Sequence, residues 1–175
     1  MGRLKALEQS CLSAVDVTQE RLLTLLKENA ETEFGKKHEF SEICSVYDYK
    51  RKVPFSVFDD YAASVDRMMR GEKHVLTAYP ISFYAHTSGT LGKAKNIPFS
   101  EKAEGLVRDH ASVSGEAYAE YLSGMLRRIP AAPKTLYLAT AREDHAPDGT
   151  MITNFSGRFM IENKAALQRI AVKPE

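Results

Sequence analysis

The chain has 175 residues, and its 24 basic and 23 acidic side chains give a formal net charge of +1 at pH 7. This balance lacks the strongly basic surface that nucleic-acid binding favours, and no apolar run approaches the ~18 residues of a membrane span. The length allows one domain that buries roughly 70% of its unfolded surface. We therefore expect a single domain over residues 1–175 that binds neither nucleic acid nor membrane.

Cysteine and histidine usage predicts no metal site. Cys11 and Cys44 are too few for a disulfide framework, and the five histidines have no metal-ligand spacing with them or with one another. We expect both cysteines to be ordinary buried thiols in a reducing compartment, and hence a cytoplasmic protein.

Helical periodicity dominates the first seventy residues. The spacing predicts helices over Leu4–Val15 and Thr18–Ala30. A third helix would follow Ser56, which has the chemistry of an N-cap, with Asp59 near the positive end of the helix dipole, and would close at Gly71. Its aromatic and methionine stripe is expected to be core, with Phe58, Tyr61, Ala62, Val65, Met68 and Met69 on one face.

From His74 the pattern changes to short β-favouring runs. Strands are predicted at His74–Thr77, Ile81–His86 and Lys95–Phe99, and the last two would form a hairpin-like pair. A long helix capped by Ser100 would then reach about Leu126.

The final fifty residues predict a buried strand over Thr135–Ala141 and one or two helical turns after Asn163. Between them, Met151–Asn154 and Arg158–Ile161 could pair around Ser156-Gly157. The expected fold class is mixed α/β, with helices packed on a sheet.

The loop between the paired strands is the most informative feature of the chain. Residues 87–95 read T-S-G-T-L-G-K-A-K. Two glycines allow several backbone N–H groups to turn toward one point, and hydroxyls and ammonium groups complete a polyphosphate site. The alternative is a Ser/Thr/Gly-rich turn that binds no ligand. His86, just before the loop, could likewise contact ligand or simply end a strand.

The loop does not match a Walker A motif, G-x-x-x-x-G-K-[ST]. That motif would need glycine where Thr87 stands, and a hydroxyl where Ala94 follows Lys93. Ser88 also lies outside any G-x-S-x-G nucleophile elbow.

The loop instead resembles the phosphate-binding motif of adenylate-forming enzymes, roughly T-S-G-T-T-G-x-P-K. Leu91 and Ala94 depart from it, replacing a threonine and the proline. The remaining fixed positions match at Ser88, Gly89, Thr90, Gly92 and Lys95.

The flanks extend this likeness to one family. From Tyr49 to Pro98 the chain resembles the amino-terminal region of the GH3 family of acyl-acid amido synthetases, and Glu28 to Gly35 resembles the end of that family's first long helix. The resembling parts are Pro54, Asp59-Asp60-Tyr61, Gly71-Glu72, Val75-Leu76-Thr77, Pro80, the glycine loop and Ile97-Pro98.

The resemblance implies the amino-terminal part of an adenylate-forming large domain, with helices packed on an incomplete sheet. It implies ATP and Mg²⁺ as cofactors, and a small carboxylic acid and an amino acid as substrates of the complete protein. Lys95 would offset charge on the departing pyrophosphate as the catalytic residue, while Lys93 could be functional or a solvated surface lysine. The phosphate-binding set would be Thr87, Ser88, Gly89, Thr90, Leu91, Gly92 and Lys93.

The family's remaining parts, including the adenine pocket and a mobile carboxy-terminal domain, have no room in 175 residues. We expect an amino-terminal piece, from a truncated reading frame, an incomplete gene model or a degenerate copy. Two functions stay open: an ATP-dependent ligase represented by its phosphate loop, or a catalytically silent remnant that acts at most as a nucleotide-binding or interaction module.

Overall fold

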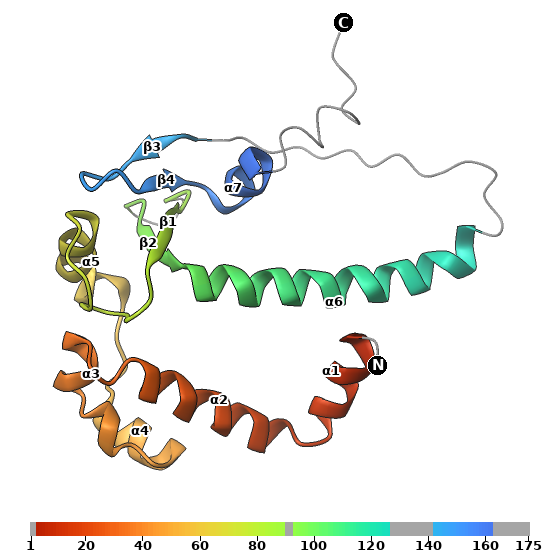
Figure 1. Ribbon diagram of the computed structural model, residues 1–175, viewed down its shortest axis with the longest axis horizontal. Helices are drawn as coiled ribbons and strands as arrows, with labels where there is room; N and C mark the ends of the chain where they lie inside the picture. Colours follow the sequence, from red (N-terminus) through yellow and green to blue (C-terminus); the bar gives the residue numbers. More distant parts are fainter. Residues whose placement is uncertain (1–2, 90–92, 127–141, 163–175) are drawn as a thin grey trace, which may run out of the picture. The chain divides into compact units, whose positions relative to one another are not determined.

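The computed structural model describes residues 3–89, 93–126 and 142–162 (Figure 1). They fall into two compact units. The helical unit comprises the described residues of Met1–Ser56, Lys73–Tyr79 and Glu101–Thr135, and the sheet unit those of Val57–Glu72, Pro80–Ser100 and Leu136–Glu175. No helix in these ranges is long and apolar enough to cross a membrane.

The helical unit confirms the predicted helices but shifts one break. The first helix ends at Cys11, and the second begins at Ala14 rather than near Thr18, so the interruption falls at Leu12 and Ser13. The elements are α1 (Arg3–Cys11), α2 (Ala14–Glu28), α3 (Glu33–Lys37), the 3-10 turn η1 (Phe40–Glu42), α4 (Val46–Lys52) and α6 (Glu101–Leu126).

The core of this unit lies where α2 meets α3 and η1. Leu26, Phe40 and Ile43 are buried there, and Phe34 contacts the Phe40 ring edge-on at 5.6 Å between centroids. The two cysteines do not belong to this core. Cys11 and Cys44 are both exposed free thiols, so the expectation of buried thiols was wrong.

Residues 74–77 do not form the predicted strand. His74 adopts a positive φ of 58°, and the carbonyls of His74 and Val75 accept from the N–H groups of Glu33 and Phe34 at 2.8 and 3.0 Å. Those two N–H groups open α3 and have no partner within the helix. The segment therefore caps a helix instead of pairing in a sheet.

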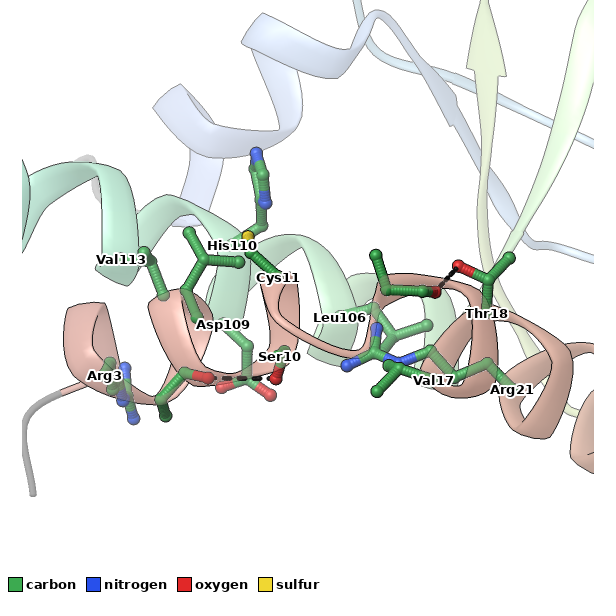
Figure 2. A pocket seen from close by; sticks show the side chains of 13 residues that line it. Arg3, Ser10, Cys11, Val17, Thr18, Arg21, Leu106, Asp109, His110 and Val113 are labelled. Atoms are coloured by element: carbon green, nitrogen blue, oxygen red, sulfur yellow. Dashed lines mark hydrogen bonds between the residues drawn. The ribbon is translucent and has the colours of Figure 1, made fainter.

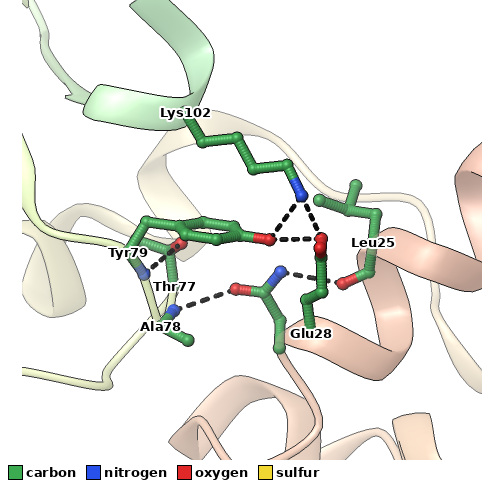
Figure 3. Close-up of polar contacts among 7 residues, drawn as sticks. Leu25, Glu28, Thr77, Ala78, Tyr79 and Lys102 are labelled. Carbon is green, nitrogen blue, oxygen red and sulfur yellow. Dashed lines mark hydrogen bonds and ion pairs between the residues drawn. The ribbon is translucent and has the colours of Figure 1, made fainter. Parts of the chain in front are cut away.

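A polar cluster joins the end of α2 to the start of α6 (Figure 3). The Glu28 carboxylate accepts from both the Tyr79 hydroxyl and the Lys102 ammonium, which also lies 2.7 Å from the Tyr79 oxygen. Bonds from Lys102 first, and then from Tyr79, hold the pKa of Glu28 below its usual range. The cluster fixes the first turn of α6 against α2.

The sheet unit is built on four short strands in the order β2-β1-β4-β3. They are β1 (Ile81–His86), β2 (Asn96–Ser100), β3 (Asp144–His145) and β4 (Met151–Thr153). β1 and β2 pair antiparallel, which confirms the predicted hairpin, and β1 and β4 run parallel. β3 pairs antiparallel with β4.

The residues after β4 form a helix, not the predicted second strand of a hairpin. Residues Phe155–Glu162 are α7, in which Arg158 and Glu162 form an ion pair at 3.0 Å with i,i+4 spacing. β4 instead uses β1 and β3 as partners. The helix places Phe155 against Phe83 and Phe99, with ring centroids 6.4 and 5.4 Å apart.

The helix predicted after Ser56 begins later than expected. The 3-10 turn η2 (Phe58–Asp60) comes first, and α5 runs over Ala62–Met69. The capping carboxylate is that of Asp60, which accepts from the Val57 N–H at 2.8 Å, so Ser56 is not the cap. The predicted core stripe is confirmed at Val65 and Met68, which are buried.

The mixed α/β class is thus confirmed, and the long helix has its predicted bounds. The predicted strand over Thr135–Ala141 and the turns after Asn163 lie outside the described residues.

Candidate functional site

The topology of the sheet unit brings four chain segments to one edge. Because β1 and β4 are parallel, their carboxyl ends lie at the same edge, and the antiparallel β2 and β3 begin there. Polar side chains occur on all four segments. His86 ends β1 and Asn96 begins β2, while Arg142 precedes β3 and Asn154 follows β4. Ligands of α/β sheets bind outside the carboxyl ends of the strands. We call this the carboxyl edge.

The predicted phosphate loop leaves the sheet at this edge and is closed at its base. The Thr87 N–H donates to the Lys95 carbonyl, and the Lys95 N–H donates to the Thr87 hydroxyl oxygen, both at 2.9 Å. These two N–H groups are therefore used within the loop. Donors for a ligand would have to come from the residues between them.

Gly89 has a φ of +66°, in the left-handed region where a side chain is unfavourable. This is the conformational need expected of a glycine that turns a loop. Thr90, Leu91 and Gly92 lie outside the described residues, so their place in the phosphate-binding set stays a prediction.

The two lysines of the loop differ in their surroundings. The Lys95 ammonium lies 5.2 Å from the centroid of the Phe58 ring, whereas Lys93 is exposed. A cation over an aromatic face at an exposed site gains only about 0.5–1 kcal/mol, which a phosphate could readily replace. The catalytic assignment of Lys95 stays a prediction.

His86 joins the segments around the loop. Its Nδ1 lies 2.8 Å from the Asn96 side-chain oxygen, and its Nε2 lies 3.0 Å from Nη1 of Arg142. Because a guanidinium can only donate, Nε2 accepts and the ring carries its proton on Nδ1. His86 is thus a neutral link between β2 and the segment that precedes β3.

Two further contacts fix Arg142. Its backbone N–H donates to the Asn154 side-chain oxygen at 3.3 Å, and its Nη2 pairs with Asp144 at 3.3 Å. A bond from the His145 N–H, followed by one from Arg142, lowers the pKa of Asp144. Asn154 also donates to the Ser156 hydroxyl at 2.8 Å. A continuous polar network therefore runs along the carboxyl edge.

This donor set fits a polyphosphate better than a metal held by protein ligands. The carboxyl edge offers a left-handed glycine, hydroxyls, two lysines and an arginine, which are the groups that bind phosphate oxygens. Within residues 3–89, 93–126 and 142–162, no cluster of three histidine, cysteine or acidic side chains could hold a metal ion.

A groove lies in the helical unit, where α1 and α2 face α6 (Figure 2). This groove of about 750 Å³ has apolar walls that include Leu7, Val17 and Leu106. The hydroxyls of Ser10 and Thr18 donate to helix carbonyls at 2.9 and 2.7 Å. Both hydroxyls are thus used inside their own helices, and Cys11, Asp109 and His110 also line the groove.

Sequence reasoning missed Asn96, Arg142 and Asn154. Asn96 could have been found, because it is the register partner of His86 across the predicted hairpin. Arg142 and Asn154 gave no local signal, since they meet only when β3 pairs with β4.

The fold is thus a mixed α/β domain with a glycine loop at the carboxyl edge of its sheet, and comparison with known protein families identifies its class. A model of the GH3 family N-terminal domain matches residues 3–175. The chain therefore belongs to the GH3 family.

Curated and solved relatives agree with this assignment. The chain is 30% identical over 87 residues to indole-3-acetic acid-amido synthetase GH3.3 of Arabidopsis thaliana, covering 48% of this chain and 15% of that protein. It is 27% identical over 101 residues to GH3.4 of the same plant, covering 57% of this chain and 17% of that protein. A solved GH3.15 acyl acid amido synthetase has the same fold, with a TM-score of 0.79 and 22% identity, covering 98% of this chain and 30% of the other.

Proposed function

We propose that this chain supplies the phosphate-binding loop of an ATP-dependent acyl-acid amido synthetase. In the proposed reaction, a carboxylate attacks the α-phosphate of ATP and releases pyrophosphate, leaving an acyl-adenylate. The amine of an amino acid then attacks the activated carbonyl and displaces AMP, forming an amide. We place the protein in the cytoplasm, where ATP and amino acids are available.

The roles of the loop follow from the chemistry of phosphate binding. Backbone N–H groups between Ser88 and Lys93 would donate to β- and γ-phosphate oxygens, with hydroxyl donors from Ser88 and Thr90. Lys95 would leave the Phe58 ring to offset the charge that builds on pyrophosphate. Mg²⁺ would be held mainly by phosphate oxygens, because Mg²⁺ sites of this kind use few protein ligands.

The observation that carries this proposal is the position of the loop. It is tied at its base by Thr87 and Lys95, turned at Gly89, and set at the carboxyl edge of a parallel strand pair. Together with family membership, this favours a nucleotide site over a chance cluster of loop residues.

The second candidate is a catalytically silent remnant that acts at most as a binding or interaction module. The chain covers 15% and 17% of the two amido synthetases and 30% of the solved GH3.15 chain. We therefore expect no ATP–pyrophosphate exchange from the 175-residue chain alone, with any of a panel of carboxylic acids.

The dependence of nucleotide binding on the loop residues separates the two candidates. Isothermal titration of the full chain with ATP and Mg²⁺ should give saturable binding, and Lys95→Gln or Gly89→Ala should weaken it by roughly tenfold. Lys36→Gln is the matched control, because Lys36 pairs with Glu31 at 3.1 Å on the exposed face of the helical unit. Equal affinity in all four proteins would favour the silent remnant.

A further inference from the structure

We propose that Arg142 is an anion-binding residue of the carboxyl edge and takes a terminal phosphate oxyanion of the same polyphosphate that the loop binds. The inference rests on the proposed function for its ligand, but on different residues for its geometry. Arg142 lies outside residues 87–95, and no loop motif points to it.

The guanidinium of Arg142 has more hydrogen-bond donors than its contacts with described residues use. A guanidinium has five N–H donors in one plane. Among the described residues, the side-chain contacts of Arg142 with His86 and Asp144, at 3.0 and 3.3 Å, account for two of them. Its side chain is 54% exposed. The remaining donors can therefore face a ligand while the guanidinium stays anchored.

The groups that bind the Arg142 guanidinium differ from those around a structural arginine. A buried structural arginine is normally matched by carboxylates in close bidentate pairs. Arg142 instead donates to the neutral imidazole of His86 at 3.0 Å and to one carboxylate, that of Asp144, at the longer distance of 3.3 Å. His86 orients the guanidinium without cancelling its charge, so the charge stays available to an oxyanion.

The local balance of charge also bears on the kind of ligand. The described residues of the loop carry Lys93 and Lys95, and the segment before β3 carries Arg142, Glu143 and the first residue of β3, Asp144, so three cations stand against two anions. The excess is positive, which favours an anion over a cation. Arginine binds phosphate through two parallel N–H donors, which a lysine cannot offer.

The test is titration of the full chain with inorganic tripolyphosphate, a probe with no base or sugar. Arg142→Gln should raise the dissociation constant by roughly tenfold, and Arg142→Lys should give an intermediate value. The matched control is Arg67→Gln, because Arg67 also pairs with one acidic residue, Glu72, in the sheet unit but on α5. Its affinity should equal that of the unaltered chain.

Each outcome bears on one claim. Unchanged affinity in Arg142→Gln, or an equal loss in Arg67→Gln, would overturn the role of Arg142. If Arg142→Gln weakens tripolyphosphate binding but Lys95→Gln does not, the anion site stands and the loop assignment fails. If Arg142→Gln instead loses binding of benzoate and keeps that of tripolyphosphate, the arginine serves a carboxylate and the phosphate assignment is wrong. Circular dichroism of each variant should match the unaltered chain, and Arg142→Lys provides the comparison should Arg142→Gln fail to fold.

Discussion

Two polar regions of this chain use their side chains in opposite ways. In the helical unit, Asn29 and Thr32 are 5% and 0% exposed, and each side chain bonds to backbone groups. At the carboxyl edge of the sheet unit, Arg142 is 54% exposed and anchored by a neutral histidine. Polar residues of the first kind hold the chain in place, whereas those of the second kind keep donors accessible.

The comparison matters because likeness of sequence does not separate the two kinds. The stretch that includes Asn29, Thr32 and Gly35 and the glycine loop both resemble GH3 sequences. Burial and bonding distinguish them, so substitutions should cost stability in the first region and ligand affinity in the second.

The largest loss of stability is expected from Gly35→Ala. A Cβ at Gly35 would overlap the Asn29 carbonyl oxygen and lie 2.9 Å from that of Ala30. Both obstacles are backbone atoms in a buried turn, so relief requires movement of the chain. We expect the free energy of unfolding to fall by about 3 kcal/mol or more, measured by urea denaturation.

Gly105→Ala is the matched control for this prediction. Gly105 lies inside α6, and a Cβ there would meet nothing within 4 Å. The change should raise stability by about 0.5–1 kcal/mol, because alanine favours a helix interior. Similar effects at both positions would mean that the turn at Gly35 is not sterically closed.

The next largest effect is expected from Asn29→Ala. The side chain donates to the Leu25 carbonyl at 2.8 Å and accepts from the Ala78 N–H at 2.9 Å. Removing it leaves the partly buried Ala78 N–H without this acceptor, while the Leu25 carbonyl still accepts from the Asn29 backbone N–H at 3.2 Å, so we expect a cost of about 2 kcal/mol in unfolding free energy. Asn96→Ala, at the partly exposed carboxyl edge, should cost less than about 1 kcal/mol. Equal losses would contradict the proposed difference between the two regions.

The sequence predicted regular elements well where one local pattern decides them. The hairpin of β1 and β2 and the bounds of α6 follow from strand alternation, the glycine loop and the position of Ser100. The strand predicted at residues 74–77 is wrong because the His74 and Val75 carbonyls accept from the N–H groups of Glu33 and Phe34, which lie far earlier in the chain. The periodicity of a sequence segment does not reveal a hydrogen-bond partner so distant in the chain.

The candidate site was predictable only in part for the same reason. The loop has its own signature, and Gly89 has the backbone conformation that this signature implies. The Arg142 position depends on β3 pairing with β4 through two register pairs. Strand pairs this short have no clear pattern in sequence.

A smaller effect, and an opposite sign, is expected from Tyr84→Phe. Tyr84 is fully buried in β1, and its hydroxyl has no hydrogen-bond partner among the described residues. Deleting an unpaired buried hydroxyl should raise the unfolding free energy by about 1 kcal/mol at pH 7. A loss of stability would show that the hydroxyl has a partner, and a bound water would then be the first to seek.

The same substitution removes a pH dependence. Burial first, and the negative charge of Asp148 second, raise the pKa of Tyr84 to about 12 from its usual 10. A raised folded-state pKa means that the native chain holds the proton more tightly, so stability is complete below pH 10 and falls as pH rises toward 12. Tyr84→Phe should lose up to about 2 kcal/mol less than the unaltered chain over this window, as measured by urea denaturation at each pH.

The smallest effect is expected from Glu28→Gln, although this carboxylate has two partners. Glu28 bonds to Lys102 and Tyr79 at the surface of the helical unit (Figure 3), where solvent screens the pair. At pH 7 the thermal midpoint should not change measurably. Because the pKa of Glu28 is lowered, its contribution is present above pH 4.5 and is lost as pH falls further, so the thermal midpoints of the two proteins should also be equal in acid. Glu31→Gln, which removes a simpler exposed pair with Lys36, is the matched control. A clear drop at pH 7 in Glu28→Gln alone would mean that the cluster, like Asn29, belongs with the residues that hold the chain in place.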